Sequence, residues 1–125
     1  MEGSNTAVVL LNDLMFRVKI EEALKRVGFI PLFTSSAAEA RQSIQAGAQL
    51  AVIDLNYSGA RPLEVISELK SDPHARSVHL LAYVSHVQTD LRKAAEERGC
   101  DQVIARSALI PALLRIAEYI GEEKE

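Results

Sequence analysis

Short runs of apolar residues alternate with longer amphipathic stretches along the chain. The run Ala7–Leu11 is aliphatic without interruption, which is typical of a strand buried on both faces of a parallel sheet. In the next stretch charged residues occupy one side of a helix, and the other side is apolar, at Phe16, Ile20, Ala23, Leu24 and Val27. The pattern therefore predicts a buried strand followed by an amphipathic helix, which Asp13 caps at its start and Gly28 ends.

Four further strands follow the same pattern. They are predicted at Phe29–Thr34, Leu50–Leu55, His79–Val84 and Gln102–Ala105. Pro31 lacks a backbone N–H group, so the second strand is expected at or near an edge of the sheet. Each strand is followed by a stretch with helical periodicity.

Capping residues mark the ends of these helices. Ser36 and Glu39 form a capping box at the start of the second helix, which Gly47 closes. Pro62 suits the first turn of the third helix, which ends before Pro73. The last two helices are predicted at Val87–Arg98 and Ala108–Ile120. Five β-then-α units predict an α/β fold of three layers, in which helices cover both faces of a doubly wound, five-stranded parallel sheet.

Composition narrows the class of protein. A chain of 125 residues predicts a single domain, whose core runs from about residue 7 to residue 120. The net charge of −3 argues against direct binding of nucleic acid, which needs clustered Lys and Arg. The one cysteine, Cys100, is expected to be a small buried residue in a reducing, cytoplasmic setting. The N-terminal residues do not resemble a signal peptide, and the apolar runs are too short to span a bilayer.

Polar side chains follow the predicted strands at their carboxyl ends, where ligands bind in open α/β sheets. They are Asn12, Asp13, Asp54, Asn56, Ser85, His86 and Arg106. The carboxylates of Asp13 and Asp54 suit a hard cation such as Mg²⁺, which takes oxygen ligands. Arg106 is expected opposite them, where it could pair with an anionic oxygen. The sequence thus predicts a site for a cation and an anion at this rim.

Three segments resemble the receiver domains of two-component response regulators, the CheY-like family. VVLLND resembles the first strand with its acidic pair, LAVIDLN the third strand with its phosphoacceptor, and GCDQVIARS the segment that carries the family's lysine. The resemblance extends over essentially the whole chain and implies a flavodoxin-like (βα)5 fold. It implies that Asp54 accepts a phosphoryl group, that Asp13, Asp54 and the backbone carbonyl of Asn56 bind Mg²⁺, and that Arg106 replaces the lysine.

The sequence also departs from the family pattern. Asn12 replaces the first acid of the metal pair, which makes it a weak ligand and is expected to weaken Mg²⁺ binding. Val84 falls on the switch Ser/Thr and has no hydroxyl, and Ser85 is expected to face the other side if the strand continues. Val103 stands where the family usually has an aromatic residue, and Ser107 replaces a proline.

Several of these residues also have purely structural interpretations. Asp13 could serve only as a helix N-cap, although capping and metal binding do not exclude each other. Arg106 could be an ordinary ion-paired surface arginine. Ser85 and His86 could lie beside Asp54, with the histidine making the site pH-sensitive, or His86 could simply be solvated.

The sequence is therefore compatible with two functions. In the first, the chain is a stand-alone receiver in a phosphorelay and not an enzyme; Asp54 accepts the phosphoryl group from a histidine kinase or phosphotransfer protein. The face of the fourth and fifth helices then signals to a downstream protein or to a second copy in a homodimer. In the second, a pseudo-receiver binds partners without phosphorylation. A flavodoxin-like electron carrier is disfavoured, because Asn12–Met15 contains no Gly, Ser or Thr to cradle a phosphate.

Overall fold

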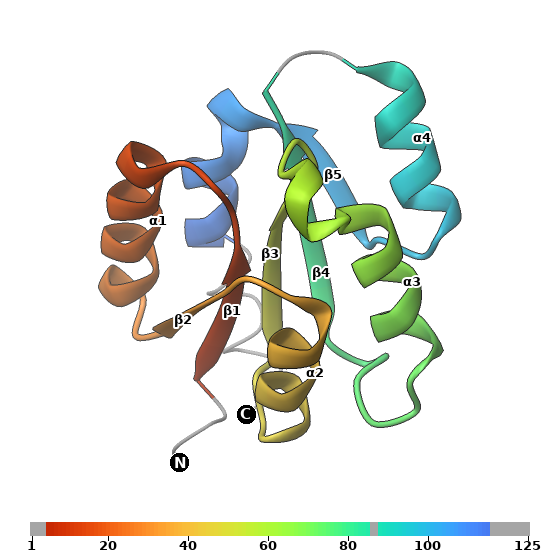
Figure 1. Ribbon diagram of the computed structural model, residues 1–125. Helices are drawn as coiled ribbons and strands as arrows, with labels where there is room; N and C mark the ends of the chain where they lie inside the picture. The colour runs from red at the N-terminus through yellow and green to blue at the C-terminus, as the bar shows by residue number, and fades with distance from the viewer. Residues whose placement is uncertain (1–4, 86–87, 116–125) are drawn as a thin grey trace.

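A parallel sheet forms the centre of the molecule in a computed structural model that describes residues 5–85 and 88–115 (Figure 1). The strand order is β2-β1-β3-β4-β5, and every neighbouring pair is parallel. The strands are β1 (Thr6–Leu10), β2 (Ile30–Thr34), β3 (Leu50–Asp54), β4 (His79–Val84) and β5 (Gln102–Ala105). The predicted five-stranded doubly wound sheet is confirmed, and the Pro31 strand lies at an edge as expected.

Helices cover both faces of the sheet. They are α1 (Leu14–Arg26), α2 (Ala37–Gln45), α3 (Pro62–Ser71) and α4 (Thr89–Glu97), with short 3-10 turns at Ser58–Ala60 and Arg106–Ala108. The last predicted helix begins with the second of these turns and continues as α-helix over 109–115, beyond which its predicted end lies outside the described residues. None of the described helices has the length and apolar character needed to cross a membrane.

Two apolar layers form the core. On one face α2, α3 and α4 pack through Ile44, Ile66 and Ala95 against Val8 and Ala82. On the other face α1 and the helix at 109–115 lie side by side (Figure 1). Their side chains pack against the alternate residues of the same strands, namely Phe16, Ile20, Leu24, Leu109 and Leu113 against Val9, Val52 and Leu81. Strand residues buried on both faces explain the uninterrupted apolar runs.

Helix capping follows the sequence with one difference. The Asp13 carboxylate accepts a hydrogen bond from the Phe16 N–H at 3.0 Å, and the Ser36 hydroxyl accepts one from the Glu39 N–H at 3.2 Å. Glu39 was expected to bond back to the Ser36 backbone, but it accepts from the Ser35 N–H at 2.9 Å instead. The hydrogen bond from the Glu39 side chain back to the backbone is therefore shifted by one residue. Both helices begin where predicted.

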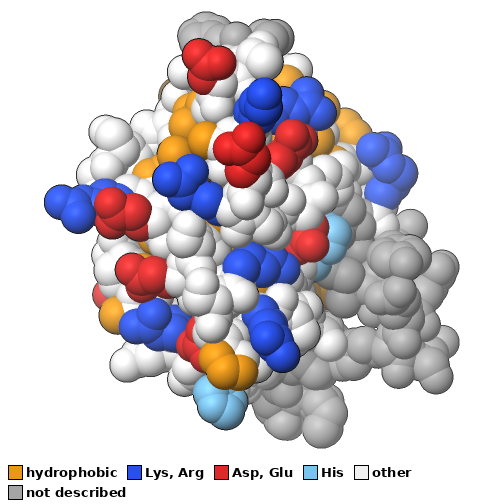
Figure 2. All heavy atoms as spheres, turned by 90° about the vertical axis from the view of Figure 1, so that its right-hand side faces the viewer, with side chains coloured by type: hydrophobic (Ala, Val, Ile, Leu, Met, Phe, Trp, Pro, Cys, Tyr) orange, Lys and Arg blue, Asp and Glu red, His pale blue; other side chains and the backbone are white. Residues whose placement is uncertain are grey.

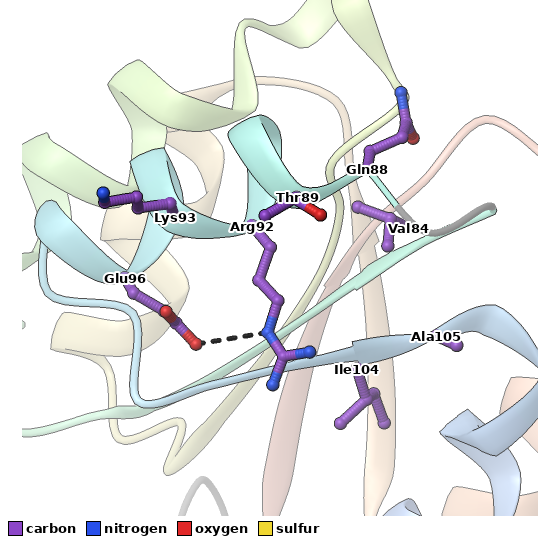
Figure 3. Close-up of a pocket in the computed structure, with 8 residues that line it drawn as sticks. All are labelled: Val84, Gln88, Thr89, Arg92, Lys93, Glu96, Ile104 and Ala105. Atoms are coloured by element: carbon purple, nitrogen blue, oxygen red, sulfur yellow. Dashed lines mark hydrogen bonds and ion pairs between the residues drawn. The ribbon is translucent and has the colours of Figure 1, made fainter.

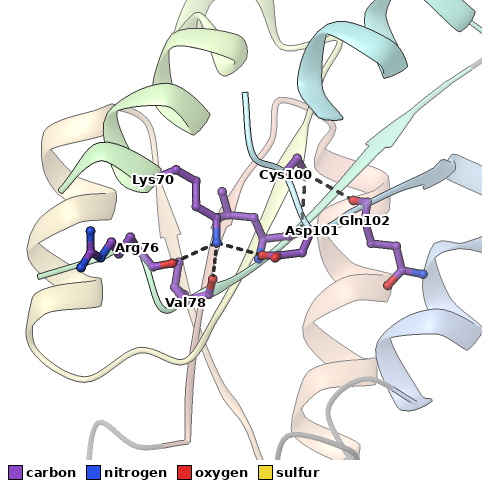
Figure 4. Close-up of polar contacts among 7 residues, drawn as sticks. Lys70, Arg76, Val78, Cys100, Asp101 and Gln102 are labelled. Atoms are coloured by element: carbon purple, nitrogen blue, oxygen red, sulfur yellow. Dashed lines mark hydrogen bonds and ion pairs between the residues drawn. The ribbon is translucent and has the colours of Figure 1, made fainter. Parts of the chain in front are cut away.

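Lys70 joins three segments at the amino ends of β4 and β5 (Figure 4). Its ammonium group donates to the Arg76 and Val78 carbonyls and to the Asp101 carboxylate, each at 3.0 Å. The same Asp101 oxygen accepts from the Leu80 N–H at 2.8 Å. All three ammonium donors are thus used, which ties the end of α3 to the starts of both strands.

Cys100 lies next to this cluster and is buried, as the sequence predicted. Its thiol is directed at the carbonyls of Leu80 and Gln102, at 3.5 and 3.3 Å. Burial raises the pKa of the Cys100 thiol to about 11. The thiol therefore stays protonated at neutral pH, and its role is packing.

Candidate functional site

Three charged side chains meet at the carboxyl ends of the strands. Asp13 follows β1, Asp54 is the last residue of β3, and Arg106 follows β5. Because β1 and β3 are neighbours, the two carboxylates lie on adjacent strand ends. Arg106 reaches this rim from the far side of β4, and its charge acts on both carboxyl groups. The predicted grouping of two acids and one guanidinium is therefore present in the structure.

Asp54 is the most enclosed of the three groups, with 8% of the residue exposed. Burial raises the pKa of its carboxyl above the ordinary value, and the charge of Asp13 adds to this. Hydrogen bonds from the backbone amides of Asn56 and Asn12 and the charge of Arg106 oppose the increase. The Asn56 N–H donates to Oδ1 at 2.9 Å, which orients the carboxylate at the strand end.

Asp13 has both carboxylate oxygens engaged. Oδ1 caps α1 by accepting from the Phe16 N–H, and Oδ2 accepts from Arg106 Nη2 at 2.6 Å. The Phe16 hydrogen bond is the largest cause of its lowered pKa, and the hydrogen bond and charge of Arg106 lower it further. Asp13 is thus a helix cap and an ion-pair partner at once.

Arg106 contacts Asp13 and also stacks on an aromatic ring. Its guanidinium carbon lies 4.1 Å from the centre of the Phe16 ring, in a cation–π arrangement. The sequence placed Arg106 opposite the two acids, ready for an anion. In the structure its hydrogen bond is made to Asp13, so the anion-binding role requires the guanidinium to turn away from that carboxylate.

The Asn56 side chain links the end of β3 to the start of α4. Its Oδ1 accepts from the Ser85 N–H and hydroxyl at 2.8 and 2.9 Å, and its amide donates to Gln88 Oε1 at 2.9 Å. Ser85 was expected to face away if the strand continued, but β4 ends at Val84 and the Ser85 hydroxyl points to Asn56. His86 lies outside the described residues.

The oxygen donors at the rim suit a hard divalent cation. Carboxylates of Asp13 and Asp54, the Asn56 carbonyl and the Asn12 amide are the kinds of ligand that Mg²⁺ takes. Among the described residues no three His, Cys, Asp or Glu side chains gather in a metal cluster, so carbonyl oxygens and water would complete the shell. The donor set fits, but a cation that binds Asp13 Oδ2 has to displace the Arg106 guanidinium.

Replacing Arg106 by methionine is expected to tighten Mg²⁺ binding about fivefold, because it removes a competing partly exposed ion pair. Isothermal titration calorimetry with Mg²⁺ measures the change. Arg17→Met is the matched control, since the Arg17 guanidinium also stacks on a ring, that of Phe33 at 4.0 Å, but outside the rim. Equal Mg²⁺ affinity in Arg106→Met and the unchanged protein would show that the ion pair does not compete.

Replacing Asp54 by asparagine is expected to stabilise the fold at neutral pH. Since burial raises the carboxyl pKa in the folded state, ionisation costs the folded chain more than the unfolded one. The protonated group therefore favours folding below the unfolded pKa, and this advantage is lost as the pH rises through the raised folded pKa. Urea unfolding measured from acidic to neutral pH should show that the difference in free energy of unfolding between Asp54→Asn and the unchanged protein increases as the pH rises. A gap of constant size would contradict this origin.

A groove of about 510 Å³ lies between α4 and β5, next to the rim (Figure 3). Val84 and Gln88 line one end, and Ile104 forms part of its apolar floor. Arg92 extends from α4 across the groove and pairs with Glu96 at 3.4 Å (Figure 3). The neighbouring surface carries acidic and basic side chains intermixed, with small hydrophobic areas between them (Figure 2).

The structure resembles solved response regulators over nearly its whole length. A response regulator from Hahella chejuensis superposes with a TM-score of 0.80 at 18% identity, covering 94% of this chain and 95% of that one. One from Thermotoga maritima gives a TM-score of 0.75 at 18% identity, covering 94% and 97%. The chain has the receiver fold. No family model and no curated protein sequence matches it.

A third structure with the receiver fold was solved with ligands. A response regulator protein from Burkholderia pseudomallei, described with a phosphorylated aspartic acid and a calcium ion, gives a TM-score of 0.75 at 18% identity and covers 96% of this chain and 72% of that one. In this chain the receiver fold brings Asp13, Asp54 and Arg106 to the rim that the sequence indicated.

The sequence pattern does not indicate the hydrogen bonds that join the Asn56 side chain to Ser85 and to Gln88. The sequence indicates a role only for the backbone carbonyl of Asn56. The signal that could have found them is the adjacency of β3 and β4, which brings the residues just beyond both strand ends together.

Proposed function

We propose that the chain is a receiver module of a phosphorelay and that Asp54 accepts the phosphoryl group. The observation that carries this proposal is the position of Asp54, a largely buried carboxylate at the end of the central strand with Asp13 and Arg106 beside it. An acid in that place has no partner side chain that explains its burial among the described hydrogen bonds, whereas nucleophilic chemistry does explain it.

The transfer makes one bond and breaks one. An Asp54 carboxylate oxygen forms the new O–P bond while the P–N bond to a phosphohistidine of the partner breaks, and the imidazole nitrogen keeps the electron pair and takes up a proton. A divalent cation supplies positive charge for the phosphoryl oxygens when it is bound at the rim. The Asn56 N–H donates to Oδ1 of Asp54 and so orients the carboxylate that attacks phosphorus.

In this scheme Arg106 can pair with Asp13 or with the phosphoryl group on Asp54. Before transfer it pairs with Asp13 and rests on Phe16. After transfer the phosphoryl group adds negative charge at Asp54, and a guanidinium binds such oxygens through two parallel hydrogen bonds. We infer that Arg106 then moves from Asp13 to the phosphoryl group, which changes the surface where β5 meets the next helix.

The signal is proposed to leave through the face of α4 and the last helix. The groove between α4 and β5 begins at Val84 and Gln88, and Gln88 is hydrogen-bonded to Asn56 at the rim. A change at Asp54 can therefore reach the groove through two side chains. The partner on this face is a downstream protein or a second copy of the chain.

Treatment with a small phosphodonor tests the proposal. The protein is incubated with acetyl phosphate and Mg²⁺, and intact-mass spectrometry follows the addition of one phosphoryl group. We expect labelling with Mg²⁺ and none when EDTA removes the metal. If the protein stays unmodified under conditions that label an ordinary receiver, the phosphorelay function is wrong.

A second function, that of a pseudo-receiver, is favoured by the Arg106–Asp13 pair. That pair neutralises Asp13 without a metal, and Val84 offers no hydroxyl to a phosphoryl group. A pseudo-receiver binds its partner equally well with and without Mg²⁺ and is indifferent to Asp54→Asn. Loss of partner binding under either change would exclude it.

A further inference from the structure

Tyr83 is a buried polar residue that the mechanism above does not use. It is the second-last residue of β4 and is 1% exposed. Its hydroxyl has no hydrogen-bond partner among residues 5–85 and 88–115. A buried hydroxyl without a partner destabilises a fold, because it has lost its bonds to water. Its presence beside a functional rim therefore calls for a ligand as the missing partner.

The strand register places Tyr83 next to Asp54. The two residues are Cα partners in the parallel pairing of β3 with β4. In-register residues of neighbouring strands direct their side chains to the same face. By alternation this is the face of Val52 and Leu81, against which α1 packs. Tyr83 thus lies beside the phosphoacceptor carboxyl, on the face of the sheet that Arg106 approaches.

Tyr83 also contacts the aromatic ring on which Arg106 rests. Its ring meets the Phe16 ring edge-on, with centroids 5.5 Å apart, and Arg106 lies over the same Phe16 ring. Burial is the main cause of a raised Tyr83 pKa, and the charges of Asp54 and Asp13 raise it further. The hydroxyl therefore keeps its proton at neutral pH and can act as a hydrogen-bond donor.

We propose that the Tyr83 hydroxyl donates a hydrogen bond to the oxyanion that binds at Asp54, supplying the donor that Val84 lacks. This inference rests on the proposed function, in which that oxyanion is the phosphoryl group. A phosphoryl oxygen is a strong acceptor, and a donor already held in place by packing loses little freedom on binding it. The bound anion would give the Tyr83 hydroxyl the hydrogen-bond partner that it lacks among the described residues.

Tyr83→Phe tests the inference because it removes one oxygen atom and keeps the ring. The probe is beryllofluoride with Mg²⁺, which mimics a phosphoryl group on a carboxylate, and amide NMR titration gives its affinity. We expect Tyr83→Phe to bind the probe about tenfold more weakly, since a hydrogen bond to a charged acceptor is lost. Its resistance to urea should be equal to or greater than that of the unchanged protein, which separates a binding role from a structural one.

Tyr57→Phe is the matched control. Tyr57 lies just beyond the end of β3, close to Asp54 in the chain. It packs against the apolar cluster on the opposite face of the sheet. It should bind beryllofluoride as the unchanged protein does. Equal affinity in Tyr83→Phe and the unchanged protein overturns this inference alone. No binding by the unchanged protein overturns the proposed function and this inference with it.

Discussion

Asp54→Asn is expected to abolish phosphoryl labelling by acetyl phosphate and Mg²⁺. The asparagine amide keeps the shape of the side chain but has no carboxylate oxygen to attack phosphorus. The neighbouring acid is a poor substitute, because both oxygens of Asp13 already accept hydrogen bonds. Intact-mass spectrometry after equal incubation should show full loss of the label in this variant.

Asp90→Asn is the control for that experiment. Asp90 lies exposed in the first turn of α4, so its replacement changes the charge equally without altering the rim. It should be labelled like the unchanged protein, and urea unfolding should show that Asp54→Asn remains folded. Labelling of Asp54→Asn at the normal level would place the acceptor elsewhere.

Lys70→Met is expected to lower the free energy of unfolding by about 2 kcal/mol, because it removes charge-assisted hydrogen bonds from a largely buried ammonium group. The methionine keeps the apolar stem that packs against Gly99. It leaves the Arg76 and Val78 carbonyls without the ammonium donor, while Asp101 retains its bond from Leu80. Urea denaturation followed by circular dichroism measures the loss.

Lys25→Met provides the comparison. Lys25 pairs with Glu21 on the surface of α1, and its side chain is 63% exposed. Such a pair contributes only about 0.3–0.5 kcal/mol. If Lys70→Met and Lys25→Met lower the free energy of unfolding equally, the Lys70 hydrogen bonds at the start of β4 and β5 do not stabilise the fold more than a surface ion pair does.

The elements of the fold were predictable because their signals are local. The apolar run after residue 6, the Asp13 cap and Pro62 at a helix start each act within a few residues, and each appears within one residue of its expected position. The edge position of β2 also follows from one residue, since Pro31 has no backbone N–H to donate to a neighbouring strand. The ends of the elements were predicted less accurately. β1 begins and ends one residue earlier than predicted, and β3 ends at Asp54 instead of Leu55.

The contacts within the site were less predictable than its members. The predicted positions of the strand ends indicate which residues lie at the rim, but they do not indicate which of these residues form hydrogen bonds with one another. Arg106 and Asp13 are separated by 93 positions, and the choice of Asp13 as the hydrogen-bond partner depends on the distance from β5 to β1 and on the Phe16 ring beneath the guanidinium. The Asn56 contacts depend likewise on where β4 ends, which a pattern read along one strand does not show.

A crystal structure of the protein with Mg²⁺ and beryllofluoride would show whether Asp54 accepts a phosphoryl group. We expect beryllium bonded to an Asp54 oxygen, Mg²⁺ bound to Asp13 and the Asn56 carbonyl, and the Arg106 guanidinium moved from Asp13 to the fluoride atoms. Crystals grown under saturating ligand that leave Asp54 unmodified, with Arg106 still paired to Asp13, would contradict phosphoryl acceptance at this rim and favour the pseudo-receiver.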